Sequence, residues 1–321
     1  MSGEGTVLGL DGGGSNTVCV IVEEGGRVVS RAVAGPCNHQ SISIQSARAA
    51  LAEAVGFARR AAGDPDLRAA CLGMAGLDRD ADLPLIQEMI APLFEGVPLE
   101  IVHDADIALA AGTGGRKFGV AVIAGTGSIA LGYNAAGIRV RAGGWGHILG
   151  DEGSGYDIAL RGLNAATRAS DGRGPATSLT EKLLATTGDG SLEELADRIY
   201  LDGWTVGQTA ALAPVVMAAA EAGDRVASEI VASAAHELAL AAGVVIEALG
   251  LQEEIFPVIL SGGIFASSQQ IFEPVRQAVN ELAPRAEVAR PAHEPAYGAA
   301  LMALQRLRQE GGEHSNVVRY W

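Results

Sequence analysis

Residues 6–22 read TVLGLDGGGSNTVCVIV, and this stretch decides the fold. Two β-rich apolar runs flank three consecutive glycines, and a third run at 27–33 follows a Glu-Gly-Gly turn. Apolar runs separated by glycine turns are typical of antiparallel strands. The pattern predicts a meander of three strands whose first turn is rich in glycine.

The same layout returns at residues 118–142, where apolar runs flank a second glycine loop, GTGS, before a NAAG turn. Gly13 precedes the turn glycine Gly26 by 13 positions, and Gly125 precedes Gly137 by 12. A repeat of this kind predicts a duplicated fold with facing halves. The alternative is a coincidence between two hairpins in a chain that holds 43 glycines.

Helices are predicted where apolar residues recur at steps of three and four, or where alanine-rich runs end in glycine or proline. They cover 43–62, 82–92, 177–186, 192–198, 206–222, 225–249, 268–282 and 296–309. Further strands are predicted at 69–73, 98–103 and 257–260. Strands that alternate with helices indicate the α/β class.

Composition limits the partners. The chain has 321 residues, 48% of them hydrophobic, and a formal charge of −15, so it can form packed cores but would repel a polyanion. We expect no nucleic acid partner. A nucleotide stays possible, because backbone N–H groups and a metal ion can hold its phosphates.

The three cysteines, Cys19, Cys37 and Cys71, are odd in number and show no CxxC spacing. This predicts reduced thiols in a cytoplasmic protein. The N-terminus has no basic region before an apolar segment, and the apolar stretch 238–251 carries Glu247 and falls short of a membrane span. We expect a soluble protein with no membrane partner.

The first glycine loop, DGGGSNT at 11–17, suits a phosphate chain. Consecutive glycines let N–H groups approach phosphate oxygens, and Ser15 and Thr17 could add hydroxyl donors. Asp11 could hold Mg²⁺ through water. A strand rather than a helix follows, and GxxxxGK[ST] is absent, which argues against a Walker A loop. An ordinary β-turn fits this segment about equally well.

Two further glycine segments are weaker candidates for ligand loops. AGTGS at 124–128 offers Gly125 and Gly127 for close approach, with Thr126 and Ser128 as hydroxyls. Paired with the first loop, it could grip one phosphate chain. The segment SGG at 261–263 follows a strand, so that an adenosine could lie on its backbone; a tight αL turn is the alternative.

Asp104 ends the strand LEIVH and begins a helix, where an ionised carboxylate is stabilised. It could accept the proton of an attacking sugar hydroxyl while the loops and Mg²⁺ hold the γ-phosphoryl group. The alternative is a simple N-cap. Asp106 is the less attractive choice because it lies inside the helix.

The segment GGWGHILGDEGSGY at 143–156 cannot form a regular helix or strand. An indole on such a loop needs a partner, and Asp151 and Glu152 are suitable acceptors for sugar hydroxyls. The alternative is a surface loop with Trp145 packed beneath it. His147 alone fits a structural role, and Asn38 and His39 are either turn residues or sugar ligands.

Assembled in order, these segments resemble the N-acetylglucosamine kinase branch of the BadF/BadG/BcrA/BcrD ATPase family, from Leu8 to about Leu304. The resemblance rests on DGGGSNT, NH, HDA, AGTGS, GGWGHILGDEGS, SGG and AYGAAL. Of these, the WGHxxGDEGS pattern is the specific one. It implies an α/β fold of the duplicated, ribonuclease H-like, actin/hexokinase type with a central cleft. The two domains would be 1–116, joined by the C-terminal helix 297–321, and 117–296.

The resemblance also implies the roles of the matching residues. The phosphate loops would be formed by Asp11, Gly13, Gly14, Ser15, Gly125, Thr126 and Gly127, and the adenosine motif by Gly262 and Gly263. Asp104 matches the catalytic base. Sugar-site positions would be Asn38, Trp145 and Asp151, with Ser128 beside them, and His39, Gly144 and Glu152 are further substrate candidates.

The implied activity is transfer of the ATP γ-phosphoryl group to the 6-hydroxyl of N-acetylglucosamine, with Mg²⁺ as metal and a homodimer as the assembly. Glucosamine and N-acetylmuramic acid are alternative substrates. An ATPase that activates a redox enzyme is the alternative of another class. It would need bridging cysteines in the second half, and none follows Cys71.

Overall fold

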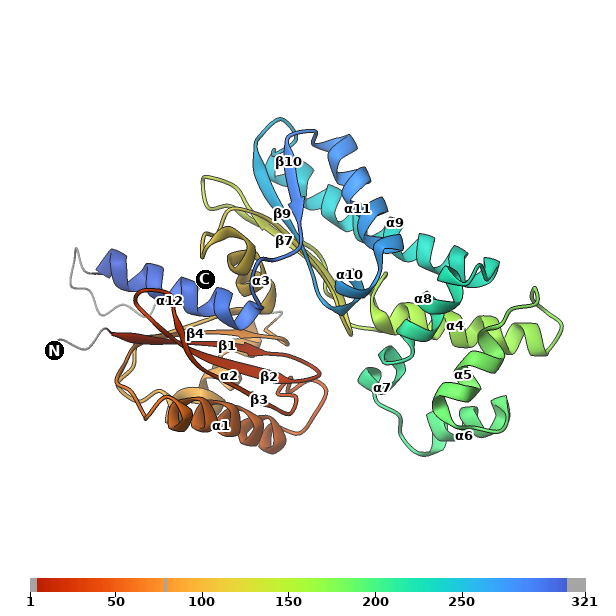
Figure 1. Cartoon of the computed structure of the whole chain (residues 1–321), viewed down its shortest axis with the longest axis horizontal. Helices are drawn as coiled ribbons and strands as arrows, with labels where there is room; N and C mark the ends of the chain where they lie inside the picture. Colours follow the sequence, from red (N-terminus) through yellow and green to blue (C-terminus); the bar gives the residue numbers. More distant parts are fainter. Residues whose placement is uncertain (1–4, 78–79, 311–321) are drawn as a thin grey trace. The chain divides into compact units, whose positions relative to one another are not determined.

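The computed structural model describes residues 5–77 and 80–310, and the chain divides into two compact units. Unit 1 comprises Met1–Ala121 and Pro291–Trp321, and unit 2 comprises Val122–Arg290. The sequence predicted these divisions after residue 116 and before residue 297. Each unit is organised around one five-stranded sheet, shown in Figure 1.

The sheet of unit 1 has the strand order β3-β2-β1-β4-β5. Its strands are β1 (Thr6–Gly12), β2 (Thr17–Glu23), β3 (Val28–Ala34), β4 (Leu67–Met74) and β5 (Leu99–His103). The first three form the predicted antiparallel meander, whereas β4 pairs in parallel with β1 and with β5. This arrangement brings the ends of β1 and β5 to the same edge of the sheet.

Helices cover both faces of this sheet (Figure 1). They are α1 (Ile44–Ala61), α2 (Leu83–Ile90), α3 (Asp104–Thr113) and α12 (Pro295–Glu310), with short 3₁₀ turns at Asp80–Asp82 and Ala91–Leu93. Residues of α1 and α2 fill one apolar core, and residues of α3 and α12 fill the other. Burial on both faces explains why β1 and β2 are apolar along nearly their whole length.

The C-terminal helix α12 lies unusually close to β1 and α3. A Cβ atom on Gly9 would be 2.1 Å from the carbonyl oxygen of Ala296, and one on Gly298 would be 2.1 Å from that of Ile107. Glycine at both positions therefore permits the backbones to touch. Tyr297 also donates its hydroxyl to the Gly26 carbonyl at 2.8 Å, which ties the start of α12 to the turn between β2 and β3.

The sheet of unit 2 repeats the strand order of unit 1. Its order is β10-β9-β6-β7-β8, from β6 (Gly119–Ala124), β7 (Ser128–Tyr133), β8 (Arg139–Gly143), β9 (Phe256–Ser261) and β10 (Ala286–Ala289). Ranked by position in the chain, both sheets read 3-2-1-4-5. The predicted duplication is therefore confirmed. The short edge strand β10 was not predicted, because AEVA offers only one strongly apolar residue, Val288, between a Pro-Arg pair and Arg290.

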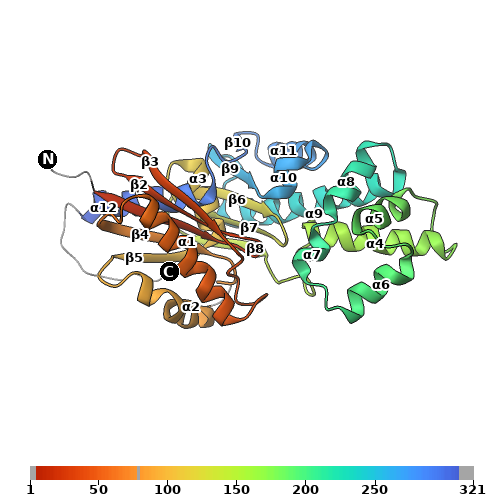
Figure 2. The same cartoon turned by 60° about the horizontal axis from the view of Figure 1, so that its bottom comes forward.

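The helices of unit 2 gather in two groups, which Figure 2 separates. The sheet is covered by α9 (Arg225–Leu249), α10 (Gly263–Ser267) and α11 (Gln269–Leu282). Beside it lie α4 (Gly155–Ser170), α5 (Leu179–Thr187), α6 (Leu192–Leu201), α7 (Val206–Ala210) and α8 (Ala213–Glu221). The single helix predicted at 206–222 is wrong, because Pro214 in the first turn of α8 cannot continue the hydrogen-bond ladder of α7.

Helix α9 is long and apolar enough, by length and composition alone, to cross a membrane. The apolar stretch 238–251 noted in the sequence begins within the C-terminal half of this helix. Its packing accounts for the composition: α9 contacts β7, β8, α8 and α11, and eleven of its residues are buried within unit 2. A core helix of this kind passes the same test.

Candidate active site

The first glycine loop has a fixed base and an exposed tip. A Cβ atom on Gly12 would lie 2.7 Å from both the Cys37 and the Met74 sulfur, so only glycine lets β1 end here. The Gly13 N–H donates to the Asn16 carbonyl at 3.0 Å, which closes the turn. Gly14 and Ser15 lie exposed at the tip, where a Cβ on Gly14 would meet no atom within 4 Å.

Thr17 plays a different part from the one predicted. It is fully buried in β2, and its hydroxyl donates to the Gly35 carbonyl at 2.8 Å. This hydrogen bond holds the loop against the segment that leads to Asn38. The Thr17 hydroxyl is therefore committed within the fold, and Ser15 is the hydroxyl that lies at the tip of the loop.

Asp11 ends β1 beside two further carboxylates. Desolvation by burial, followed by the charges of Asp104 and Glu294, raises the pKa of Asp11 to about 7. Glu294 itself receives hydrogen bonds from Arg31 at 2.9 Å. A cation near Asp11 would relieve both the desolvation and the repulsion, so the residues present fit a bound metal ion.

The residues around Asp11 fit a metal ion that keeps most of its water ligands. Among residues 5–77 and 80–310, no group of three His, Cys, Asp or Glu side chains lies close enough to hold a metal alone. Mg²⁺ commonly keeps several waters and binds through one or two carboxylates together with substrate phosphates. Asp11 would then be the protein's contribution.

Asp104 is the first residue of α3, and His103 is its N-cap. The His103 Nδ1 accepts the Ala105 N–H at 3.0 Å, and Asp106 Oδ2 accepts the His103 N–H at 3.2 Å, which completes a capping box. The interpretation of Asp104 as a simple N-cap is therefore wrong. Asp106 is buried and serves this cap.

The Asp104 carboxylate retains proton-accepting capacity. Its Oδ1 is buried without a hydrogen-bond donor and lies 2.6 Å from His103 Nδ1, while 26% of the side chain is exposed. The helix N-terminus stabilises the ionised form. The arrangement suits a general base.

Asn38 and His39 lie in a turn of unit 1. Asn38 Oδ1 accepts the Gln40 N–H at 3.0 Å, and the Asn38 carbonyl accepts the Ser41 N–H at 3.0 Å. A Cβ atom on Gly76 would lie 2.7 Å from Asn38 Oδ1, so glycine makes room for the turn. The interpretation as turn residues is confirmed for Asn38, and a sugar contact by either residue stays a prediction.

The second glycine loop is held by the start of α4. The Gly155 N–H donates to the Gly125 carbonyl at 2.7 Å, and the Tyr156 N–H donates to the Thr126 carbonyl at 3.3 Å. A Cβ atom on Gly127 would lie 2.8 Å from Asp151 Oδ2. The structure thus brings the second loop and the DEGS segment, Asp151–Ser154, together within unit 2.

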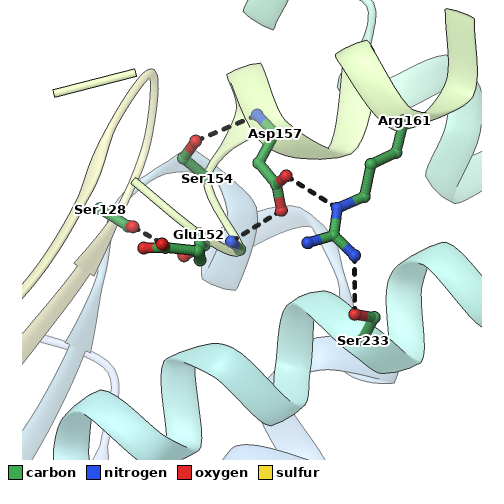
Figure 3. Close-up of polar contacts among 7 residues, drawn as sticks. Ser128, Glu152, Ser154, Asp157, Arg161 and Ser233 are labelled. Carbon is green, nitrogen blue, oxygen red and sulfur yellow. Dashed lines mark hydrogen bonds and ion pairs between the residues drawn. The ribbon is translucent and has the colours of Figure 1, made fainter. Parts of the chain in front are cut away.

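The DEGS segment is fixed to the loop by a second contact. Ser128 donates its hydroxyl to the Glu152 carbonyl at 2.7 Å (Figure 3). Asp151 is 9% exposed and has a φ of 60°, an uncommon conformation for a residue with a side chain. Glu152 is exposed. Ser128 therefore positions the backbone here, and its predicted sugar contact stays a prediction.

Trp145 is 64% exposed, with the Arg141 guanidinium carbon 4.8 Å from its ring centre. The alternative of an indole packed beneath the loop is therefore wrong. Gly144 has a φ of 70°, and a Cβ there would lie 2.7 Å from Ile129. His147 is exposed and meets Tyr156 edge to face at 4.9 Å, so it is not a buried structural histidine.

The SGG segment links β9 to the short helix α10. Gly262 has φ 102° and ψ 166°, so the interpretation as an αL turn is wrong. A Cβ atom there would be 2.3 Å from the Ala124 carbonyl oxygen at the end of β6. A Cβ on Gly263 would meet no atom within 4 Å, so backbone is open to a flat ligand.

Two residues of the candidate site were not identified from the sequence. Glu294 neighbours Asp11, and Arg141 neighbours Trp145. The position of Glu294, directly before the predicted C-terminal helix, was the signal available for it. Arg141 had none, since a single arginine in a strand has no distinctive spacing.

Comparison with known proteins gives consistent results. An N-acetylmuramic acid/N-acetylglucosamine kinase from Clostridium acetobutylicum is 36% identical over 299 residues, covering 92% of this chain and 97% of that protein. An N-acetyl-D-glucosamine kinase from Dictyostelium discoideum is 35% identical over 311 residues, with the same coverage. The crystal structure of a protein from Chromobacterium violaceum, provisionally named N-acetylglucosamine kinase, matches with a TM-score of 0.72 and 27% identity, covering 94% of this chain and 99% of that one.

The family model for BadF/BadG/BcrA/BcrD ATPases matches residues 8–303, nearly the range of the resemblance seen in the sequence. Its match includes both glycine loops, Asp104 and the DEGS segment. The chain belongs to the BadF/BadG/BcrA/BcrD ATPase family.

Proposed function

We propose that this chain transfers the γ-phosphoryl group of ATP to the 6-hydroxyl of an amino sugar, with N-acetylglucosamine as the preferred acceptor. The observation that carries the proposal is the Asp104 carboxylate, which begins a helix, lacks a hydrogen-bond donor on Oδ1 and neighbours Asp11 at the end of the first glycine loop. The names of the relatives support the choice of an amino sugar.

In the proposed reaction, Asp104 accepts the proton of the sugar hydroxyl as that oxygen attacks the γ-phosphorus. General bases of this kind contribute roughly a hundredfold to ten-thousandfold in rate. The two glycine loops bind the ATP phosphates, and Gly262 and Gly263 supply backbone to the adenosine. Mg²⁺, held through Asp11, would neutralise phosphate charge.

The sugar would bind to the loop that carries Trp145 and Asp151. The exposed indole offers an apolar face to a pyranose ring, and the Asp151 carboxylate accepts hydrogen bonds from sugar hydroxyls. The N–H of Gly144, the Glu152 carboxylate and Asn38 and His39 of unit 1 are further contacts that we propose for the acceptor.

Two other amino sugars remain as candidate acceptors. Glucosamine lacks the acetyl group, and N-acetylmuramic acid adds a lactyl ether that carries a carboxylate. The Clostridium acetobutylicum relative is named for both N-acetylated sugars. A coupled ADP-release assay over hexoses and amino sugars ranks these acceptors by kcat/KM.

An ATPase that activates a redox enzyme is the alternative of another class. The absence of cysteines after Cys71 disfavours it, because a bridging cluster would need thiolates. Purified protein that contains iron and hydrolyses ATP without phosphorylating any sugar would support this alternative.

We further propose that the enzyme is a cytoplasmic homodimer. All three thiols are free and buried, which agrees with a reducing compartment. Light scattering coupled to size-exclusion chromatography measures the assembly; a mass of one 32.8 kDa chain at assay concentration would refute the dimer.

The decisive experiment is Asp104→Asn. Asparagine has nearly the same shape as aspartate, and the cap of α3 is made by His103 and Asp106, so we expect the fold and both Michaelis constants to be retained. We expect kcat to fall at least about a hundredfold because the base is lost. Unchanged turnover would remove Asp104 from the mechanism.

A further inference from the structure

The DEGS segment has an unusual backbone. Asp151 is the site carboxylate of unit 2, and its φ of 60° is rarely adopted by residues with a side chain. Such conformations persist where the surroundings hold them in place. The contacts that fix this turn therefore also place the Asp151 carboxylate, whose oxygen lies beside Gly127 of the second glycine loop.

Several hydrogen bonds hold the turn. The Ser154 N–H donates to the Asp151 carbonyl at 3.1 Å, and the Ser128 hydroxyl donates to the Glu152 carbonyl at 2.7 Å. The Gly153 N–H donates to Asp157 Oδ2 at 3.0 Å. The first two bonds join the segment to itself and to the glycine loop. The third joins it to α4.

Asp157 is itself held by a charged partner. Besides accepting the Gly153 N–H, the Asp157 carboxylate is bonded to Arg161, one turn further along α4 (Figure 3). Arg161 Nε donates to Asp157 Oδ1 at 2.8 Å, and Arg161 Nη1 donates to the Ser233 hydroxyl on α9 at 2.8 Å. A chain of hydrogen bonds thus runs from Ser233 through Arg161 and Asp157 to Gly153.

Gly153 also meets α9 directly. A Cβ atom at Gly153 would lie 2.6 Å from the Ala234 carbonyl oxygen and 2.7 Å from Leu238 Cγ. The DEGS segment is therefore pressed against α9 at the point where Arg161 bridges α4 to the same helix. Loss of the bridge would free the Asp157 carboxylate to rotate away from the Gly153 N–H.

We propose that Arg161 is a positioning residue for the acceptor sugar: together with Asp157 and Ser233 it fixes the DEGS segment, and through it the Asp151 carboxylate. The kinetic part of this inference, a changed KM for the sugar, rests on the proposed function. Arg161 touches neither glycine loop through any hydrogen bond found in the described residues, so its effect on the reaction passes through the Gly153 N–H.

The test compares Arg161→Met with Arg168→Met in the full-length protein. Arg168 lies two turns further along the same helix, is exposed and donates to the Arg173 carbonyl, away from the DEGS segment, which makes it a matched control. For Arg161→Met we expect the KM for the amino sugar to rise about tenfold, with the KM for ATP changed less than about twofold. Arg168→Met should change neither constant.

Two further variants separate positioning from general destabilisation. In Arg161→Lys, the lysine can still reach Asp157 but cannot bridge it to Ser233 in the same planar geometry. The KM of this variant for the amino sugar should therefore lie between those of wild type and Arg161→Met. In an Asp151→Asn background, Arg161→Met should add little to the sugar KM, because the carboxylate that it positions is already lost.

Hydrogen–deuterium exchange gives a readout that does not depend on activity. A peptide that contains residues 150–157 should exchange at least about tenfold faster in Arg161→Met than in Arg168→Met or wild type, because the Gly153 N–H loses its acceptor. Faster exchange together with a sugar-selective KM effect supports the proposal. Unchanged exchange, or faster exchange with an unchanged sugar KM, overturns it.

The two proposals can also fail separately. If wild-type protein phosphorylates no amino sugar, the proposed function fails and with it the kinetic role of Arg161. The exchange experiment then still decides whether Arg161 holds the DEGS segment.

Discussion

Asp224 joins two helices of unit 2 and should make the free energy of unfolding depend on pH in the acidic range. It is the N-cap of α9, where its Oδ1 accepts the Ala227 N–H at 3.0 Å. Its Oδ2 accepts three more hydrogen bonds from the start of α5: the Ser178 N–H at 2.6 Å and the Thr177 and Ser178 hydroxyls at 2.9 Å. Burial alone would raise the pKa of Asp224, but these hydrogen bonds lower it to about 2.

The sign of the pH dependence follows from that shift. The pKa falls from its ordinary value of 3.8 to about 2 in the folded protein, so the carboxylate form stabilises the fold. The difference between 3.8 and about 2, at about 1.4 kcal/mol per pKa unit, corresponds to at most about 2.5 kcal/mol; because the carboxylate is partly exposed, solvent screening reduces the contribution at pH 7 to roughly 1 kcal/mol. It is present above pH 3.8, falls to about half by pH 3, and is lost as the pH passes below about 2.

The measurement is urea unfolding of wild type and Asp224→Asn between pH 3 and pH 7. The difference in unfolding free energy should be roughly 1 kcal/mol at neutral pH and should shrink toward pH 3. Asp171→Asn is the control, since that carboxylate is exposed and pairs with the nearby Arg173. A difference that stays constant over this pH range would show that the charge of Asp224 is not the stabilising feature.

Three further outcomes are expected. Trp145→Ala should raise the KM for the amino sugar about tenfold or more and leave the KM for ATP nearly unchanged. The melting temperature should also change little, because the indole is 64% exposed. An effect confined to the KM for ATP would contradict the sugar-site role of Trp145. Gly262→Ala should lower stability by on the order of 3 kcal/mol in thermal unfolding, since its Cβ would be 2.3 Å from the Ala124 carbonyl oxygen; a melting temperature within a degree of wild type would refute the contact. The three thiols should be inert to a thiol reagent at pH 8 in the native protein and reactive after unfolding. Burial raises the pKa of Cys19 to about 12 and that of Cys37 to about 11. Fast labelling of the native protein would contradict this prediction.

Much of the fold could be predicted from the sequence because local patterns decided it. The glycine-punctuated apolar runs around Asp11 and Gly125 predicted both meanders, and the structure confirms the duplication in the shared strand order. Helix ends were predictable where glycine or proline terminates an apolar period, as at Gly250 after α9. The family and the α/β fold were predicted correctly from the ordered motifs.

The parts that could not be predicted depend on contacts between distant segments. Asp104 was expected as either an N-cap or a base, and only the geometry assigns the cap to His103. Thr17 and Ser128 have hydroxyls suited to a ligand, but their hydrogen bonds to backbone carbonyls appear only once the chain is folded. Position-specific pairing of this kind has no local sequence signal.

The placement of α12 has a consequence for how the chain matures during translation. Unit 2 is continuous in sequence, so it can complete its sheet before α12 is synthesised. The face of β1 and β4 that receives Ala296 and Ala300 stays uncovered until α12 has left the ribosome. A stop codon before Pro291 would therefore leave a nascent product with an exposed apolar sheet, a substrate for chaperones rather than a smaller working enzyme.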